Sequence, residues 1–455
     1  MRRHVIIGRF GPADDTQIPV ATDEFATPID LMASERRLAH GIGHALDDLH
    51  AIGIFPSELG LDFAVLAALV HLADTRISRD TESQDTWTRE IRLVVPVSDP
   101  ARWTNAEALL QRMLNFLTGD RWIVRFRPRP TEFDHVLPTR PEQLGRPPFN
   151  ALNLFSGGLD SLIGAVDTLE AGQTPLLVSH ASEGATSDAQ TTCFDSLKEH
   201  YKRLPFERLR VWMNFAEGIV KGVASESTTR GRSFLFLALG VFAGTGLDAP
   251  FTLHVPENGL IALNVPLDVL RLSSLSTRTT HPFYMARWND LLGQLSISGC
   301  IKNPYWSKTK GEMAANCANQ SLLKQLVGGS LSCSSPSKGR WEGRGIEHCG
   351  YCLPCIIRRA ALQVAWGRGQ DPTVYTIPDL RAQPLDTCQA EGRQVRSFQL
   401  AIARLRAKPG IENLLIHKPG PLTDESPHLA HLADVYRRGM EEVGELLADV
   451  HATPS

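Results

Sequence analysis

From Ser57 onward, helical and strand-like hydrophobic patterns alternate along the chain. The segment "SELGLDFAVLAALVHLAD" begins with a serine that suits a helix cap and carries apolar residues at helical spacing. "REIRLVVPV" alternates like a strand, and "NAEALLQRMLNFL" and "DRWIVRFRPR" repeat the helix and then the strand. We expect residues 1–130 to form a small α+β domain.

A stretch rich in proline and arginine, "TEFDHVLPTRPEQLGRPPF", follows at residues 131–149. Proline fixes the backbone and removes a hydrogen-bond donor, so we expect a linker there. Beyond it, continuous apolar runs such as "ALNLF" and "PLLVSH" alternate with helical patterns of about ten or more residues. This alternation predicts an α/β domain over residues 150–330 with a doubly wound parallel sheet, which binds ligands at the carboxyl ends of its strands.

The C-terminal part of the chain has a helical pattern. "VRSFQLAIARLRA" and "LADVYRRGMEEVGELLADV" both carry apolar residues at helical spacing. We expect a helical region over residues 366–455, with a short cysteine-containing segment, residues 331–365, between it and the sheet domain.

Composition and charge narrow the class of protein. The 455 residues include 47 Lys and Arg against 50 Asp and Glu, a formal net charge of -3, so we expect neither a membrane nor nucleic acid as a direct ligand. The most apolar stretches, "LDFAVLAALVHLA" and "FLFLALGVFAGTGL", are shorter than the roughly 18 residues of a membrane-spanning helix. The first apolar run breaks at Gly8 without a signal-peptide cleavage site. We expect a cytoplasmic protein with buried core helices.

The segment "LNLFSGGLDS" has the composition of an anion-binding loop. It places Ser156, Gly157 and Gly158 after a predicted strand and before a predicted helix, where backbone N–H groups and the helix dipole favour a bound anion. Glycines allow the backbone to approach a phosphate closely, and the hydroxyls of Ser156 and Ser161 can donate to its oxygens. A tight turn that caps the next helix explains a lone Ser-Gly-Gly about as well, and no Walker pattern surrounds it.

Four of the eight cysteines crowd into one short region as a candidate zinc site. They are Cys333, followed by Cys349, Cys352 and Cys355 in a C-x2-C-x2-C run. Four thiolates satisfy tetrahedral Zn²⁺, and a site closed by four cysteines is structural. A redox dithiol pair and buried free cysteines are the alternatives, and His348 is available as a substitute ligand.

The string "SGGLDS" after an apolar strand resembles the PP-loop of the ATP pyrophosphatases. Followed by the four cysteines, it resembles the 7-cyano-7-deazaguanine synthases, the QueC-like enzymes, and most of all their long QatC-type branch in anti-phage systems. The likeness spans roughly residues 150–365. "TTRGRS" and "NPYWSKTKGEMA" agree with stretches of the same family. The resemblance implies an adenine nucleotide alpha hydrolase-like domain of the PP-loop type.

The resemblance also implies roles for individual residues. Asp160 would help to hold Mg²⁺ and would act with three cations at the reacting phosphate, namely Arg232, Lys308 and Lys310. The remaining ATP contacts are expected from Ser156, Gly157, Gly158, Leu159, Ser161, His180 and Arg230. His180 ends a predicted strand on the ligand side, although a buried structural histidine explains it as well.

One stretch departs from the family pattern. The biosynthetic enzymes carry an acidic residue and a Tyr-Pro-Asp-Cys-Arg stretch around the deazapurine, whereas this chain reads "HVPENGLIALNVPLDVLRLSSLSTRTTHPF". A recognition site built from different polar groups selects a different substrate or presents it differently. Glu257, Asn258 and Asn264 are the candidate substrate contacts, although a turn accounts for the asparagines equally well.

The function implied by the resemblance is that of an ATP-dependent carbon-nitrogen ligase. It would use ATP, Mg²⁺ and a structural Zn²⁺ to adenylate an acid like 7-carboxy-7-deazaguanine. The acyl group would pass to ammonia, giving an amide or nitrile, or to an amine of an acceptor protein of a defence system. Two other classes compete with it: a PP-loop tRNA-modifying enzyme, which needs a basic RNA surface and catalytic cysteines, and a non-catalytic nucleotide-binding scaffold.

Overall fold

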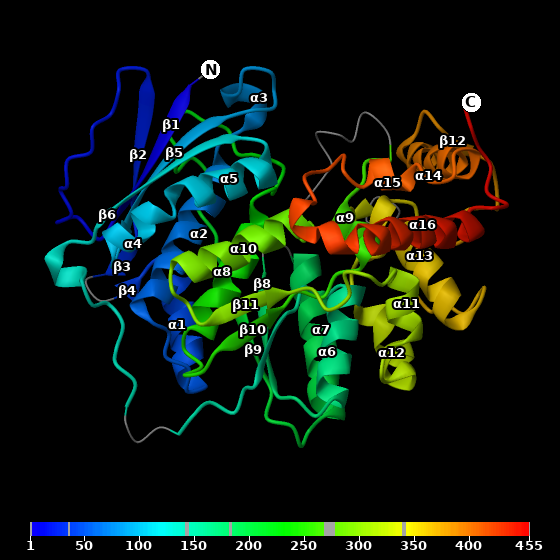
Figure 1. Cartoon of the computed structure of the whole chain (residues 1–455), viewed down its shortest axis with the longest axis horizontal. Coiled ribbons are helices and arrows are strands. Elements are labelled where there is room, and N and C mark those ends of the chain that lie inside the picture. Colours follow the sequence, from blue (N-terminus) through cyan, green and yellow to red (C-terminus); the bar gives the residue numbers. More distant parts are fainter. Residues whose placement is uncertain are drawn as a thin grey trace.

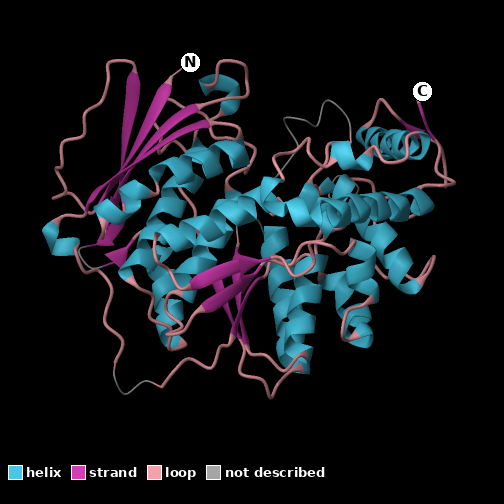
Figure 2. Ribbon diagram, in the orientation of Figure 1, coloured by secondary structure: helices cyan, strands magenta, loops and turns pink. Residues whose placement is uncertain are grey.

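The computed structural model describes residues 2–34, 37–141, 145–181, 184–267, 278–338 and 343–454. Within these residues, two larger parallel sheets form, one near the N-terminus and one at the centre of the molecule (Figures 1 and 2). Helices surround the central sheet, and the C-terminal helices lie at the opposite end of the molecule from the N-terminal sheet. No helix of the described residues is long and apolar enough to cross a membrane.

The N-terminal sheet has the strand order β2-β1-β5-β6, and each neighbouring pair is parallel. Its strands are β1 (Arg3–Arg9), β2 (Glu24–Asp30), β5 (Glu90–Val97) and β6 (Arg121–Pro128). This region is therefore of the α/β type, and the expectation of an α+β domain is wrong in that respect. The physical reason is the helical segment between β5 and β6, which lets the chain cross over and return in the same direction. The remaining elements are the antiparallel strands β3 (Met32–Ser34) and β4 (Arg37–Leu38) and the helices α1 (Ile42–Ala51), α2 (Glu58–Arg76), α3 (Arg79–Glu82), α4 (Pro100–Asn105) and α5 (Glu107–Thr118).

The central sheet has the order β11-β10-β7-β8-β9 and is parallel throughout. Its strands are β7 (Ala151–Leu154), β8 (Pro175–His180), β9 (Glu207–Val211), β10 (Phe251–His254) and β11 (Gly299–Lys302), with helices α6 (Leu159–Glu170), α7 (Gly184–His200), α8 (Arg232–Gly244) and α10 (Pro282–Gln294). Along β8, Leu176 and Val178 join the core beneath α8, whereas Leu177 joins the core beneath α6 and α7. Both faces are therefore covered, as predicted, and the strand order reverses between β7 and β10.

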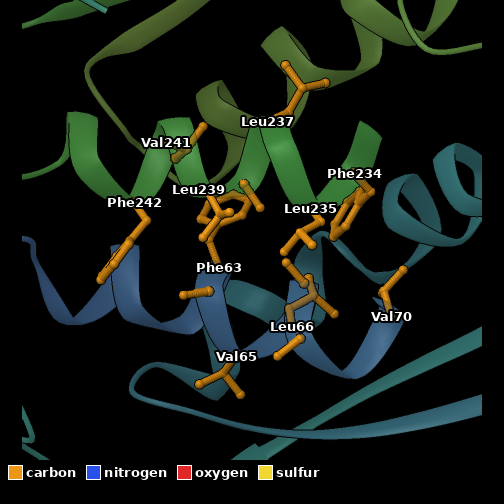
Figure 3. Close-up of a cluster of buried hydrophobic side chains, with 14 of the residues drawn as sticks. Phe63, Val65, Leu66, Val70, Phe234, Leu235, Leu237, Leu239, Val241 and Phe242 are labelled. Atoms are coloured by element: carbon orange, nitrogen blue, oxygen red, sulfur yellow. The ribbon is translucent and has the colours of Figure 1, made fainter. Parts of the chain in front are cut away.

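The N-terminal region and the central sheet share one hydrophobic core. Helix α2, which the serine cap and apolar spacing predicted, starts after Ser57, whose hydroxyl accepts a hydrogen bond from Gly60 N at 3.1 Å. Its apolar side chains interlock with those of α8 (Figure 3). Phe63 points toward α8, and Phe242 points back toward α2. The two predicted domains therefore meet through a continuous apolar interior.

A second core lies in the C-terminal part of the chain. It joins α9 (Gly259–Leu263), α13 (Leu353–Trp366), α14 (Ala390–Ala407) and α16 (Leu429–Leu446). Helices α14 and α16 match the two predicted helical segments. The other elements are α11 (Lys310–Ala315), α12 (Gln320–Leu326), α15 (Glu412–Leu415), the parallel pair β12 (Leu385–Asp386) and β13 (Ala452–Thr453), and the 3-10 turns η3 (Val327–Gly329) and η5 (Thr423–His428). The expected linker, within its described residues, contains only the 3-10 turn η1 (Thr131–Phe133).

Candidate functional site

The Ser-Gly-Gly segment lies where a doubly wound sheet binds its ligand. It follows β7, and α6 begins at Leu159 directly after it. Strand β7 borders β10 at the point where the strand order reverses, and ligands of such sheets bind at that carboxyl edge. A pocket of about 400 Å³ opens there, which we call the switch-point pocket. The predicted site residues that line it are Ser156, Ser161, Arg230, Arg232, Glu257 and Cys333.

The backbone of this loop needs glycine at one position. Gly157 has φ +78°, and a Cβ atom there would lie 2.9 Å from the backbone nitrogen of Gln190. The hydroxyl of Ser161 donates to Gly158 O at 3.0 Å and lies 3.2 Å from the hydroxyl of Ser156. The two serine hydroxyls thus sit side by side at the pocket wall, next to the N-terminus of α6.

Asp160 is the centre of a buried polar cluster. The ammonium of Lys310 lies 3.1 Å from Asp160 Oδ1, and the side-chain amide of Asn258 donates to Asp160 Oδ2 at 2.8 Å. The segment that carries Asn258 reaches α6 because Gly164 has no side chain: a Cβ there would lie 2.4 Å from Pro256 Cγ. Three residues far apart in the sequence therefore meet next to the Ser-Gly-Gly loop, residues 156–158, which we call the anion loop.

The carboxyl groups of Asp160 and Glu257 interact with each other. Burial alone would raise the pKa of Asp160, but the ammonium of Lys310 and the hydrogen bonds from Glu257 and Asn258 hold that pKa below its ordinary value. Burial and then the negative charge of Asp160 raise the pKa of Glu257 well above its ordinary range. A divalent cation bound between the two carboxyl groups would lower both pKa values.

The two arginines of the "TTRGRS" stretch both reach the switch-point pocket. The guanidinium of Arg230 lies 3.8 Å from the ring centroid of Trp87 and donates to Thr118 O at 3.2 Å. Burial, followed by the charge of Arg79, lowers the pKa of Arg230 to about 10, so it remains a cation at neutral pH. The guanidinium of Arg232 lies 5.4 Å from the ring centroid of Phe236.

The N-terminal region holds the turn that presents these arginines. Asp74 of α2 accepts a hydrogen bond from Gly231 N at 2.7 Å and pairs with Arg89 at 3.2 Å. Glu226, at the start of the same turn, accepts from Arg79 N at 2.7 Å. The N-terminal region, in which the sequence showed no site, therefore forms the support for one wall of the pocket.

The four predicted metal ligands come together. The sulfur atoms of Cys333, Cys349, Cys352 and Cys355 all lie within 4.8 Å of one another. The Sγ atoms of Cys333 and Cys352 are 3.9 Å apart, and those of Cys349 and Cys355 are 4.0 Å apart. Zn–S bonds of about 2.3 Å in a tetrahedron place the sulfurs about 3.8 Å apart. The cluster can therefore bind a metal ion such as zinc.

His348 is not part of the sulfur cluster. Its Nε2 accepts a hydrogen bond from Ser332 N at 3.2 Å, so it fixes the backbone next to Cys333. The hydroxyl of Ser332 in turn accepts from Leu159 N at 3.1 Å, and Leu331 N donates to Gly157 O at 2.8 Å. The cysteine segment thus bonds directly to the anion loop. No local pattern indicated Ser332, because its contact depends on a loop more than 170 residues away.

Four further predicted site residues lie outside the lining of the switch-point pocket, as do three cysteines of the sulfur cluster and Gly157, Gly158, Leu159, Asp160 and Lys310. His180 is fully buried, with its ring 5.7 Å from Phe236, and burial, followed by His71 and Arg232, lowers its pKa to about 3. Lys308 is exposed, with its ammonium 5.7 Å from the ring of Tyr305. Asn258 caps α9 by accepting from Ile261 N, and Asn264 ends the same helix with φ +52°. The two asparagines thus occupy a helix cap and a turn, as the alternative interpretation had it.

Comparison with known proteins adds no relative: a scan of family models finds no match, and a search of curated proteins finds none with significant similarity.

Proposed function

We propose that the protein is an ATP-dependent carbon-nitrogen ligase. It adenylates a carboxylic acid of the 7-deazapurine type and transfers the acyl group to an amine, as the likeness to QueC-like enzymes of anti-phage systems suggests. The observation that carries the proposal is the joint placement of the Ser-Gly-Gly loop, the Asp160–Lys310 pair and two arginines at one edge of the central sheet.

The residues of the switch-point pocket suit a triphosphate. The hydroxyls of Ser156 and Ser161 and the N-terminus of α6 would hold the β and γ phosphates, and Arg230 and Arg232 would face the remaining negative charge. Asp160 and Glu257 would supply the carboxylate oxygens that Mg²⁺ prefers, and Lys310 favours the ionised form of Asp160. When bound, Mg²⁺ would neutralise charge that develops on the phosphates.

Attack of the substrate carboxylate on the α-phosphate forms an acyl adenylate and releases pyrophosphate. Cations that are already positioned stabilise the transition state without reorganising. The metal-bound cysteine segment would keep the anion loop in shape through Ser332 and would take no part in the chemistry.

One observation favours the second candidate function, modification of RNA by a PP-loop enzyme. Cys333 lines the switch-point pocket, so its thiol is near the expected nucleotide. We rank this function lower because Cys333 also belongs to the four-sulfur cluster, where a bound metal would block its sulfur. If the protein modified RNA, RNA would be required for turnover of ATP.

Pyrophosphate release tests the proposal. We expect release from ATP and Mg²⁺ only when 7-carboxy-7-deazaguanine is present, and at least about a tenfold loss in Ser161→Ala, since one phosphate contact is removed. Ser196→Ala, which changes a hydroxyl bonded to Thr192 O within α7, is the matched control. Release that depends on tRNA instead of the acid would favour RNA modification, and no release would contradict both.

A further inference from the structure

Arg230 is a buried cation that lines the switch-point pocket, and it is only 8% exposed. Among the described residues, no carboxylate forms an ion pair with it, and its guanidinium donates a single hydrogen bond, to Thr118 O at 3.2 Å. A buried charge without a partner is costly. A negatively charged ligand at this guanidinium would remove that cost, so this wall of the pocket favours an anion.

Two buried carboxylates lie close enough to attract Arg230, but both are engaged by other arginines. Asp120 pairs with Arg79 and with Arg89, each at 2.6 Å, and Asp74 pairs with Arg89 at 3.2 Å. Burial and then the charge of Arg79 outweigh the attraction of the two carboxylates, and the pKa of Arg230 falls to about 10. The surroundings therefore leave Arg230 charged at neutral pH, with no carboxylate bonded to it.

Trp87 lies against this guanidinium. The residue precedes β5 in the N-terminal region, and Cζ of Arg230 lies 3.8 Å from the centroid of its ring. At that distance a guanidinium can stack on an indole, the aromatic ring that attracts cations best. Stacking uses the face of the guanidinium and leaves the N–H groups at its edge for hydrogen bonds. One of these groups bonds to Thr118 O, and the rest of the edge can bond to a ligand.

The backbone around Trp87 is shaped for this contact. Gly119 follows α5 with φ +78°, and a Cβ atom there would lie 3.3 Å from Trp87 Nε1 and 3.8 Å from Arg230 Nη1. The carboxylate of Asp85 accepts hydrogen bonds from Trp87 N at 3.2 Å and from Thr88 N at 3.1 Å, which fix the turn that carries the indole. The turn and the end of α5 thus form a slot for one arginine side chain.

Such a slot has a consequence for binding, because a free arginine side chain is flexible. Ordering it costs up to about 2 kcal/mol of rotamer entropy. The contacts with Trp87 and Thr118 order Arg230 before a ligand arrives, so less of that free energy is lost on binding. Both contacts come from the N-terminal region, in which the sequence showed no site.

We propose that Trp87 is a positioning residue, which holds the guanidinium of Arg230 in the switch-point pocket against the phosphates of ATP. This inference deepens the proposed function and rests on it for the identity of the ligand. Trp87 does not itself line the pocket, so it acts through Arg230 and not by contact with the nucleotide. The N-terminal region thus sets the affinity of the nucleotide site as well as supporting its wall.

Binding of the α,β-methylene analogue of ATP tests the inference, because this analogue keeps three phosphates but cannot release pyrophosphate. Isothermal titration calorimetry with Mg²⁺ gives its Kd for the full chain. We compare Trp87→Leu, which removes the ring, with Trp87→Phe, which keeps an aromatic face. Trp212→Leu is the matched control, because Trp212 also contacts an arginine, Arg210 at 4.9 Å, and both residues lie outside the lining of the pocket.

We expect Trp87→Leu to raise Kd about fivefold, which corresponds to about 1 kcal/mol, and Trp87→Phe to raise it about twofold. Trp212→Leu should leave Kd unchanged. Arg230→Ala should raise Kd at least about tenfold, since a charge-assisted contact is lost. Adding Trp87→Leu to Arg230→Ala should have no further effect, because the indole acts through the guanidinium.

A wild-type Kd in Trp87→Leu would overturn the positioning role, and so would a further fivefold loss when Trp87→Leu is added to Arg230→Ala. Failure of the wild type to bind the analogue would overturn it as well. If the expected pattern of Kd values is found but ATP and 7-carboxy-7-deazaguanine release no pyrophosphate, the positioning role stands and the proposed function fails.

Discussion

The N-terminal and C-terminal regions join the central sheet in different ways. The N-terminal region does so through apolar surface: α2 interlocks with α8 in the largest hydrophobic core, and the ion pairs of Asp74 lie buried beside it. The C-terminal region packs in a second, separate core, which includes Leu260 and Leu263 of α9. It meets the sheet region through that core, through the cysteine segment and through polar contacts of α16 with α11, where Arg438 pairs with Glu312 and Glu442 accepts from Gly311 N at 3.2 Å.

This difference predicts how each region responds to a destabilising substitution or to loss of a metal ion. A shared apolar core transmits destabilisation to the whole unit, because a cavity left in it belongs to both parts. A region that packs in a separate core and contains a candidate metal site can open locally while the rest stays folded. Both regions nevertheless reach the same site: one supports Arg230 and Arg232, and the other supports Leu159 and Lys310.

The largest expected effect is on the N-terminal attachment. Phe63→Ala removes a fully buried ring between α2 and α8 and should lower the free energy of unfolding by about 3–5 kcal/mol in chemical denaturation. Leu414→Ala, at a side chain that is 73% exposed, should change it by less than about 0.5 kcal/mol. If Phe63→Ala lowered the free energy of unfolding by no more than this control does, the shared core would not hold the two parts together.

Loss of the metal should act locally. In Cys352→Ser, or after chelation, we expect bound zinc to fall from one ion per chain toward none, and amide hydrogen exchange to speed up in α13, α14 and α16. The N-terminal sheet should keep its protection. Cys388→Ser, at an exposed cysteine outside the cluster, is the control. Equal loss of protection in both regions would remove the distinction between them.

Much of the fold could be predicted because its elements have strong local patterns. The caps and apolar spacing of α2 and the continuous apolar runs of β7 and β8 carry their own signal. Strand β11 has only four residues, two of them Gly299 and Cys300, and carries no such signal. The parallel direction of the N-terminal strands depends on how the chain crosses over, which the periodicity of a strand does not encode.

The site likewise has parts that local sequence patterns predict and parts that depend on contacts between distant segments. The anion loop and the four cysteines are identified from the local spacing of their residues. The structure brings the residues of each motif together. The pairing of Asp160 with Lys310 joins segments 150 residues apart; the resemblance implied a role for each residue but not the pairing. Asp160 is also more deeply structural than the sequence suggested. Because Lys310 would lose its partner, Asp160→Asn should reduce stability as well as activity.

A smaller expected effect tests the link between the cysteine segment and the anion loop. Ser332→Ala removes the acceptor for Leu159 N, which should raise KM for ATP about fivefold while lowering the free energy of unfolding by about 1 kcal/mol. Steady-state kinetics and thermal unfolding check both numbers. A KM for ATP equal to that of wild type would mean that the segment does not support the loop.

The last expected effect concerns pH. Burial, and then the charge of Glu312, raises the pKa of Glu442 to about 7, against hydrogen bonds from Thr309 and Gly311 that lower it. The folded state therefore binds this proton more tightly than the unfolded state, so the stabilisation is full below about pH 4.5 and is lost as the pH rises through 7.

Thermal unfolding of Glu442→Gln between pH 5 and pH 8 tests this account, with Glu445→Gln as the control on the same helix. Relative to Glu442→Gln, the wild type should lose stability as the pH rises, and the control should follow the wild type. Parallel curves for wild type and Glu442→Gln would show that this carboxyl does not titrate in that range.

The adenylation step itself can be tested most directly with an isotope. 7-Carboxy-7-deazaguanine labelled with ¹⁸O in its carboxylate is incubated with ATP, Mg²⁺, an amine and the protein. The mass of the AMP formed is then measured by mass spectrometry. If the carboxylate attacks the α-phosphate, one labelled oxygen leaves with AMP. AMP without label, or ADP as the product, would contradict the account.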